Sequence, residues 1–543
     1  MKVKNILLAA CCLTSALINA QKKQEADLIV SDAKIYTVNK TFQTAEALAV
    51  KDGKIIGIGS KADILKKFSA KKTLIAKGKY MYPGFYDAHA HFYGLGMNMQ
   101  AVNLRGTKSF QEVIERIQAF QKVKNHTFVI GRGWDQNDWK EKEFPSKELL
   151  DQYFPTIPVV LTRIDGHAML VNTKALELAG ITTKTKTSGG QIEVKDGKLT
   201  GILVDNPMEL VSAIIPKPTR QTQITALLEA QKEMFQYGLT TINEAGLERD
   251  IIDLIDSLQQ ENKLDINIYA MVMATRENVD HYTQLGIYKT DKLNVRSFKF
   301  MGDGALGSRG ACLHQVYSDK PKQFGALLSP IPTIREIAKQ IAESDYQMNS
   351  HAIGDSTNTV LLKIYKEVLD GKPDRRWKIE HAQIMREQDF DYFKLGIIPS
   401  VQPTHATSDM YWAEDRLGKK RLQYSYAYKT MLQKAGLIAL GTDFPIEEVN
   451  PMYTFYAAVA RKDLKNYPEN GFQSENALTR EETLKGMTIW AAYSNFEENE
   501  KGSLEVGKWA DFVIFDADIM TMDIDSVPYV VPVNTFVKGK QVK

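Results

Sequence analysis

The sequence predicts an α/β protein whose centre is an eight-stranded parallel barrel, the (β/α)8 TIM barrel. Apolar runs rich in β-branched and aromatic residues alternate with amphipathic helical segments between Tyr82 and about Asn495, which is typical of repeated βα units. Eight such runs are present, the number that closes a parallel barrel. Both chain ends are instead made of short strands and turns, and a long interval interrupts the βα pattern after the first run.

The N-terminus predicts a secretory signal peptide, residues 1–20. Lys2 and Lys4 precede an apolar stretch over 6–18, and Ala20 offers a small residue for cleavage. The stretch is too short for a stable membrane span. We therefore expect an exported protein, periplasmic or secreted. Lipid anchoring at Cys11 is the less favoured alternative, because residues 8–11 resemble a lipobox but few apolar residues precede them.

The composition excludes several kinds of partner. A net charge of +3 from 69 basic and 66 acidic residues gives no electrostatic case for nucleic acid or a membrane surface. No later segment is long and apolar enough to span a bilayer. After signal cleavage only Cys312 remains, so an intramolecular disulfide is excluded. A small-molecule substrate is expected, and a homodimer is one possible assembly by analogy with other barrels.

Residues 21–80 and 496–543 predict two parts of one β domain. The first part contains short strands and the hairpin turn Asp52-Gly53, and the second repeats the same strand and turn signals. Isolated hairpins of this size are marginally stable, so we expect both ends to pair in one small β-sandwich. The barrel, residues 81–495, would then lie between the two parts in sequence.

The interval between the first and second barrel strands is far too long for one crossover. We expect an insertion over about 102–218, with a small α/β fold. Strand-like runs at 127–130 and 159–162 and a hairpin at 190–203 support this interpretation. Because βα loops emerge at the barrel mouth, the insertion should rise over that mouth.

Residues suited to metal binding stand at the ends of the predicted barrel strands. The first strand leads to His89 and His91, whose side chains would share one face and can hold one divalent ion. Taken alone, this pair is better explained as two polar residues in a surface loop. Later strands carry or lead to Lys299, His351, His381 and Asp443. Each is commonly a structural residue, but the set converges on the end where such barrels keep their chemistry.

In these residues the chain resembles the amidohydrolase superfamily. The flanking sequences are similar to the branch called amidohydrolase family 3, which includes N-substituted formamide deformylases. The matching segments are FKFMGDGALGSR at 298–309, HAIGD at 351–355, IEHAQ at 379–383, QPTH at 402–405 and KGSLE at 501–505. The resemblance extends from about Asp27 to the C-terminus.

The resemblance implies a metal-dependent hydrolase with one or two divalent ions per chain, zinc being expected for nitrogen and oxygen ligands. It assigns one metal to His89, His91 and Asp443, a second to His351 and His381, and a bridging position to Lys299. Carbon dioxide would convert the lysine into a carbamate, since an ammonium has no lone pair to offer a metal. Asp443 would also be catalytic, taking a proton from the activated water and passing it to the leaving nitrogen.

Residues that contact the substrate are harder to identify. The candidates are His167, Trp134, Arg309, Gln402 and His405. A structural hydrogen-bonding role explains His167 equally well, and an aromatic residue such as Trp134 commonly serves packing alone. Glu380 could support the site from behind, but as the strand neighbour of His381 it should face the helical layer.

The leading hypothesis is hydrolysis of a carbon–nitrogen bond other than a peptide bond. The deformylase analogy adds a small acyl group and an apolar amine. The alternative is a one-metal deaminase, or an ester or lactone hydrolase, on the same barrel; Lys299 argues against the deaminase, which usually lacks a bridging lysine. A binding protein without activity should have lost a ligand, and none is missing. A carbohydrate-active barrel would need two carboxylates across a cleft instead of a histidine cluster.

Overall fold

The computed structural model describes residues 23–543 except 165, 167, 187–189, 206, 308 and 373. The predicted signal peptide and Cys11 lie outside the described residues. In the part of the chain that is described, no helix has both the length and the hydropathy needed to cross a membrane.

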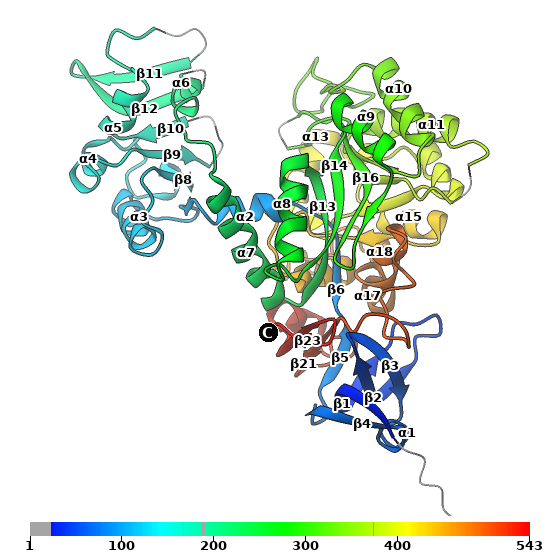
Figure 1. The fold of residues 1–543 in the computed structure, drawn as a ribbon. Helices are drawn as coiled ribbons and strands as arrows, with labels where there is room; N and C mark the ends of the chain where they lie inside the picture. The colour runs from blue at the N-terminus through cyan, green and yellow to red at the C-terminus, as the bar shows by residue number, and fades with distance from the viewer. Residues whose placement is uncertain are drawn as a thin grey trace, which may run out of the picture.

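The predicted parallel eight-stranded barrel is confirmed (Figure 1). Its strands, in spatial order, are β6 (Phe85–Ala90), β13 (Leu239–Leu247), β14 (Asn267–Met273), β16 (Leu293–Met301), β17 (Gln347–Ala352), β18 (Lys378–His381), β19 (Ile398–Val401) and β20 (Ala439–Leu440). Neighbours along this order pair in parallel, and a short β15 (Tyr288–Lys289) is added antiparallel to β16.

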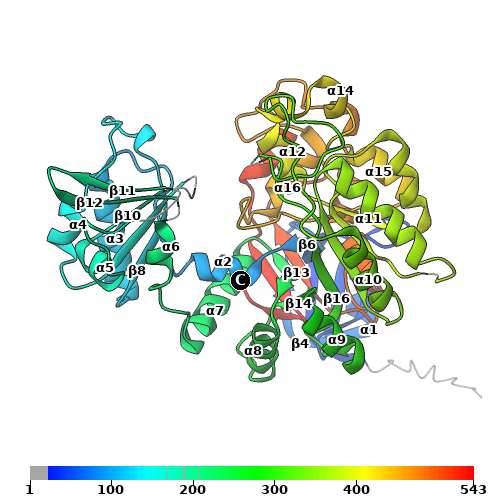
Figure 2. The same ribbon diagram turned by 90° about the horizontal axis from the view of Figure 1, so that it is seen from above.

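Helices surround the barrel, as Figure 2 shows from above. Those between or after barrel strands are α7 (Arg220–Gln236), α8 (Arg249–Gln260), α9 (Arg276–Leu285), α10 (Ile331–Ala342), α11 (Asp355–Val368), η2 (Glu387–Leu395), α15 (Tyr428–Ala435), α16 (Pro451–Ala460), α17 (Arg480–Gly486) and α18 (Ile489–Ser494). Shorter pieces lie at the mouth or in its loops: α12 (Pro403–Asp409), α13 (Ala413–Leu417), α14 (Lys419–Leu422) and η3 (Ser474–Asn476). Helix α8 is representative: it buries Ile251, Ile255 and Leu258 at helical spacing, so one apolar stripe packs on the sheet.

The insertion forms its own α/β domain. Its six-stranded sheet has the order β11 (Gly190–Lys195), β12 (Lys198–Asp205), β10 (Ala168–Val171), β9 (Val159–Arg163), β8 (Val129–Trp134) and β7 (Val102–Asn103). Strands β7, β8 and β9 are parallel, and the others are antiparallel. The helical elements are α3 (Phe110–Lys124), η1 (Gln136–Asp138), α4 (Glu148–Tyr153), α5 (Thr173–Leu178) and α6 (Met208–Ser212).

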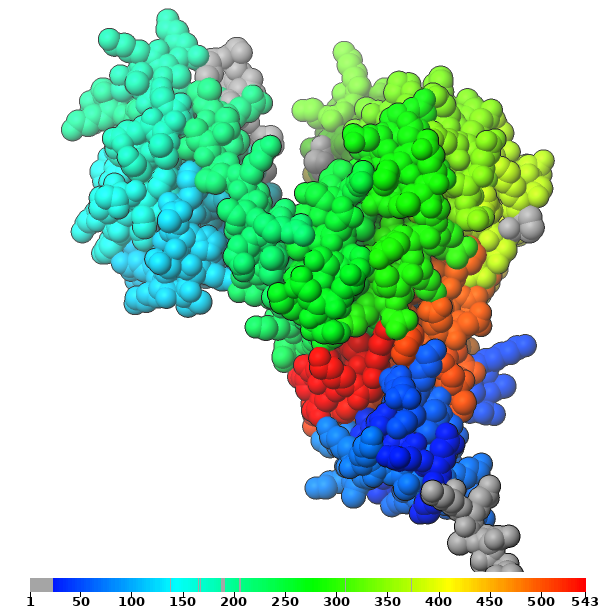
Figure 3. All heavy atoms as spheres, in the orientation of Figure 1, coloured from blue at the N-terminus to red at the C-terminus, as the bar shows by residue number. Residues whose placement is uncertain are grey.

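The inserted domain stands beside the mouth end of the barrel and not over it. Helix α2 (Phe92–Asn98) leaves the first barrel strand and packs against α7, and these two helices connect the domains (Figures 1 and 2). The close approach depends on Gly96, where a Cβ atom would lie 2.4 Å from the carbonyl oxygen of Ala226. Figure 3 shows a hollow between the inserted domain and the barrel.

Strands from both chain ends pair in one sheet below the barrel (Figure 1). Its members are β1 (Gln24–Tyr36), β2 (Thr44–Lys51), β3 (Lys54–Gly59), β4 (Phe68–Ile75), β5 (Tyr80–Pro83), β21 (Phe512–Phe515), β22 (Asn534–Val537) and β23 (Lys540–Gln541). The short helices α1 (Lys61–Lys67) and η4 (Ile524–Tyr529) accompany these strands in sequence. The two ends meet where β5 pairs with β21, and Gly84 separates β5 from the barrel strand β6. That the sheet folds as a sandwich stays a prediction.

The barrel closes without a regular ladder between β6 and β20. Instead, the Asp443 N–H donates to the His89 carbonyl at 2.8 Å, and the His91 N–H donates to the Phe444 carbonyl at 2.8 Å. The buried Asp87 carboxylate accepts hydrogen bonds from the N–H and hydroxyl of Thr442, at 3.0 and 2.7 Å, and from the His89 N–H at 3.1 Å. The seam therefore positions three of the predicted metal ligands.

Replacing Gly441 by alanine should open this seam. The added Cβ would lie 2.5 Å from the His89 nitrogen and 2.8 Å from an Asp87 oxygen. Overpacking of a buried site costs about 1–3 kcal/mol, so we expect a drop of that size in the free energy of unfolding, measured by urea denaturation. Gly94→Ala is the control, because its nearest neighbour would lie 3.4 Å away. Equal stability of Gly441→Ala and wild type would contradict the close packing of the seam.

Candidate metal centre

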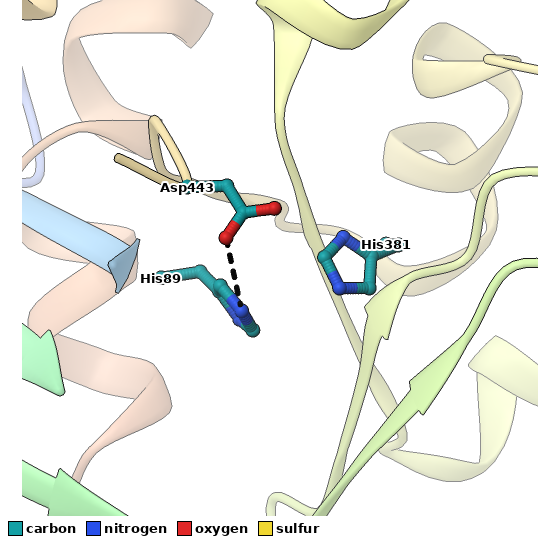
Figure 4. Close-up of side chains that lie close together, drawn as sticks. All are labelled: His89, His381 and Asp443. Carbon is teal, nitrogen blue, oxygen red and sulfur yellow. Dashed lines mark ion pairs between the residues drawn. The ribbon is translucent and has the colours of Figure 1, made fainter. Parts of the chain in front are cut away.

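Three predicted ligands from three places in the barrel meet at one point. His89 lies on β6, His381 ends β18, and Asp443 follows β20; all are buried. One ligand atom of each lies within 4.8 Å of the others. Figure 4 shows the Asp443 carboxylate directed at the His89 ring, a pair separated by 3.7 Å between Oδ1 and Nε2, with the His381 ring beside them.

The other predicted ligands surround this group. His91 Nε2 lies 3.2 Å from Asp443 Oδ1. Lys299 Nζ lies 3.0 Å from His89 Nε2, and the His351 ring centroid lies 4.5 Å from that of His381. The structure thus brings all the residues predicted as ligands into one cluster, although they come from four strands and from the loops after β6 and β20. Their individual roles as ligands stay predictions.

The chemistry of the cluster fits a divalent metal ion. His351 Nε2 and Asp443 Oδ1 are buried and have no hydrogen-bond partner in the described structure, an arrangement that is costly unless a ligand satisfies them. Burial lowers the pKa of His89 and of His381 well below the usual value, and lowers that of His351 to about 3. All three imidazoles are therefore neutral at pH 7 and offer lone pairs to a metal.

Burial also lowers the pKa of Lys299, against the raising effect of Glu380 and Asp443. The side chain is 2% exposed. A lower pKa increases the fraction of neutral amine, which is the form that reacts with carbon dioxide. The environment is therefore suited to carbamate formation.

Glu380 faces the site, and the prediction that it faces the helical layer is wrong. Its Oε2 lies 2.6 Å from His89 Nδ1, and both side chains are fully buried. The reason is a break in the alternation of the strand. His381 has a φ of +73°, a left-handed conformation that is uncommon for residues other than glycine, so neighbouring side chains no longer point to opposite sides. A carboxylate can only accept, so His89 Nδ1 carries the proton and Nε2 keeps its lone pair.

Gln402 has a similar place behind His381. Its Oε1 lies 2.7 Å from His381 Nδ1, and its side chain is buried. Gln402 therefore orients an imidazole of the cluster, and its contact with substrate stays a prediction. His89 and His381 are thus both held at Nδ1, which fixes the direction of Nε2.

The remaining substrate candidates lie in different places. His405 belongs to the cluster: its Nε2 lies 3.5 Å from Asp443 Oδ2, and its ring stacks on His381 with centroids 5.8 Å apart. Trp134 is instead a core residue of the inserted domain, 1% exposed, with its indole N–H bonded to the Leu161 carbonyl. Arg309 is paired with Asp319 at 2.8 Å in the segment after β16. His167 lies outside the described residues.

Sequence reasoning missed several acidic residues that hold the site in place. Glu244, in the second half of β13, accepts from the backbone N–H groups of Phe92 and Tyr93 and so fixes the start of α2. Asp303 accepts from the N–H groups of Ile353 and Gly354 at 3.0 and 2.8 Å. Burial raises the pKa of Glu244 to about 7 and that of Asp303 to about 6. The available signal was an acidic residue in or just after a predicted barrel strand.

A barrel that gathers buried histidines and a carboxylate at the carboxyl ends of its strands defines a metal-dependent hydrolase. The model of the Amidohydrolase family matches residues 74–543, and the chain belongs to that family.

The chain is similar to proteins from plants, bacteria and archaea. It is 32% identical to the protein LONG AFTER FAR-RED 3 of Arabidopsis thaliana over 95% of this chain and 91% of that protein. It is 23% identical to the N-substituted formamide deformylase of Arthrobacter pascens over 95% of this chain and 98% of that enzyme. A solved uncharacterized metal-dependent hydrolase from Pyrococcus furiosus superposes with a TM-score of 0.77 at 26% identity, over 91% of this chain and all of the other.

Glu380→Gln should weaken metal binding without unfolding the protein. The amide can present its N–H2 to His89 Nδ1 and so favour the wrong tautomer, and loss of such a contact typically costs 10- to 100-fold in metal affinity. Competition with a chromogenic chelator measures the change. Glu343→Gln, at an exposed position after α10, is the control. Identical affinities in Glu380→Gln and wild type would show that the contact does not orient a ligand.

The metal-stripped protein should lose stability in acid partly through His351. Its pKa is about 3 in the folded protein and near 6.5 in the unfolded chain, so between these values the unfolded chain binds more protons. Stability therefore falls as the pH is lowered from 7 to 4.5, and this one histidine accounts for about 2 kcal/mol. His351→Asn should reduce the loss by that amount in urea titrations at both pH values. An unchanged pH dependence would contradict the neutral, buried imidazole.

Proposed function

We propose that the protein hydrolyses carbon–nitrogen bonds other than peptide bonds, in N-formyl or N-acyl amines, with one or two zinc ions. The observation that carries this proposal is the position of Lys299, whose Nζ lies 3.0 Å from His89 Nε2 within the histidine cluster. A lysine at this place is suited to bridge two ions as a carbamate. The formamide deformylase among the relatives supports the choice of bond, since its name states that it acts on N-substituted formamides.

The residues divide the work as follows. His89, His91, Asp443, His351, His381 and carboxylated Lys299 would hold the metal, with His89 and His381 oriented by Glu380 and Gln402. When bound, the metal supplies a Lewis acid that polarises the substrate carbonyl and makes water acidic.

Asp443 is placed to move a proton. Burial acts to raise its pKa, but the nearby imidazoles of His91, His89 and His405 lower it below the ordinary value. Asp443 is therefore a carboxylate at neutral pH and can accept the proton of the attacking water. Its Oδ1 has no hydrogen-bond partner in the described structure. The same carboxyl then delivers the proton to the leaving nitrogen, which cannot depart as an anion.

One observation favours a second candidate, a deaminase with a single metal. Among the described residues, the group with ligand atoms closest together has three members, His89, His381 and Asp443. Such a set suffices for one catalytic ion with an open position. The number of ions bound per chain separates the two candidates.

We further propose that the protein is exported. Residues 1–20 have the charged start, apolar centre and small residue of a secretory signal. The chain after cleavage would hold a single cysteine, so oxidation in an exported compartment cannot cross-link it internally.

Metal analysis of Lys299→Ala tests the bridged site. With bicarbonate present, we expect about two divalent ions per wild-type chain by plasma mass spectrometry, and a loss of about one or more in the variant. Hydrolysis of N-formyl amines should fall by at least 100-fold, as judged by amine release. Lys339→Ala, on the exposed face of α10, is the control. One ion in both proteins would favour the deaminase, and no metal in either would disprove the site.

A further inference from the structure

A cavity lies between the inserted domain and the barrel, next to the metal cluster. Its volume is about 280 Å³, and residues from both domains line it. Pro445 and Glu447 belong to the loop that follows Asp443, and Glu447 Oε1 lies 4.0 Å from His405 Nε2. A substrate whose reacting bond lies at the cluster would therefore extend through this cavity and contact the inserted domain.

Two arginines of the inserted domain face this cavity. Arg105 follows β7, and Arg132 lies near the carboxyl end of β8; both are exposed and both line the cavity. Neither guanidinium makes a hydrogen bond or an ion pair with any described residue. Parallel strands β7 and β8 end at this edge, and the carboxyl edge of parallel strands is where open α/β sheets bind ligands.

The backbone holds Arg105 against the strand that carries Arg132. Gly133, next to Arg132, has a φ of +107°. A Cβ atom at this position would lie 2.6 Å from Arg105 Cγ and 2.9 Å from the Arg105 nitrogen, so only glycine permits this contact. Both cations line one cavity, and two like charges at one cavity favour the binding of an anion there.

We propose that Arg105 and Arg132 bind the carboxylate of the substrate, so that the preferred substrates are N-formyl or N-acyl amines that carry a carboxylate on the amine portion. The inference rests on the proposed function. Guanidinium groups suit this task because their paired N–H donors match the two oxygens of a carboxylate. The acyl carbon would lie at the metal cluster, and the amine portion would extend into the cleft.

The opposite wall of the cavity is acidic and limits where the carboxylate can bind. Glu447 accepts from the Ser408 hydroxyl at 2.6 Å and stands on the side of the metal cluster. Glu448 is exposed and lines the same cavity. These two carboxylates repel an anion from the barrel side of the cavity. A substrate carboxylate would therefore bind on the side of Arg105 and Arg132.

The test compares two substrates that differ only by the carboxylate, N-formylphenylalanine and N-formylphenethylamine. We expect Arg105→Met and Arg132→Met each to raise KM about tenfold for the first and to change it less than twofold for the second, with kcat preserved. Lys108→Met removes an exposed cation that does not line the cavity, and it should behave like wild type. Equal losses on both substrates would mean that the arginines do not act through the carboxylate, and would overturn the proposal.

A binding measurement separates this inference from the proposed reaction. If neither compound is hydrolysed, the proposed function fails, but calorimetry can still report binding of N-formylphenylalanine. Wild type should bind it at least tenfold more tightly than the double variant Arg105→Met/Arg132→Met, and the difference should shrink at high salt. Equal binding by both proteins would overturn the carboxylate site whatever the reaction is.

Discussion

The hydrogen bonds of Asp87 close the barrel, and the candidate metal site lies at the point of closure. Strands β6 and β20 stand at the two ends of the sheet order, and no regular ladder joins them. The Asp87 carboxylate connects the two by accepting from Thr442 and from the His89 backbone. His89 and Asp443, which flank this connection, come within reach of one ion as a result. Closure of the fold and assembly of the ligand set are therefore one event.

The sequence was informative wherever a signal is local. A polar residue that ends an apolar run can be recognised without knowledge of the fold, and for this reason the eight strands and the clustering of His89, His351, His381 and Asp443 could be predicted. The direction in which a side chain points could not be predicted in the same way. The direction of Glu380 depends on the φ of +73° at His381, and strand alternation predicts the opposite side.

Contacts between distant residues were the other limit. Trp134 and Arg309 have the right composition for a binding pocket, yet the Leu161 carbonyl and Asp319 satisfy their polar groups elsewhere. Gln402 was placed correctly near the site, but its partner is His381. The close contact of Arg105 with Gly133 in the insertion also could not be predicted from the residues next to either one in the sequence. Each of these outcomes depends on which segments the fold brings side by side.

The sheet built from both chain ends has a consequence for the order of folding. Strand β5 pairs with β21, and only Gly84 separates β5 from the first barrel strand. On the ribosome, β1 to β5 emerge long before the segment that completes their sheet, so one edge of β5 stays without its partner while the barrel is synthesised. Contacts between residues so distant in sequence form slowly, and an open strand edge can pair with other chains in the meantime. The nascent protein is thus most exposed to aggregation in the interval before its last strands are made.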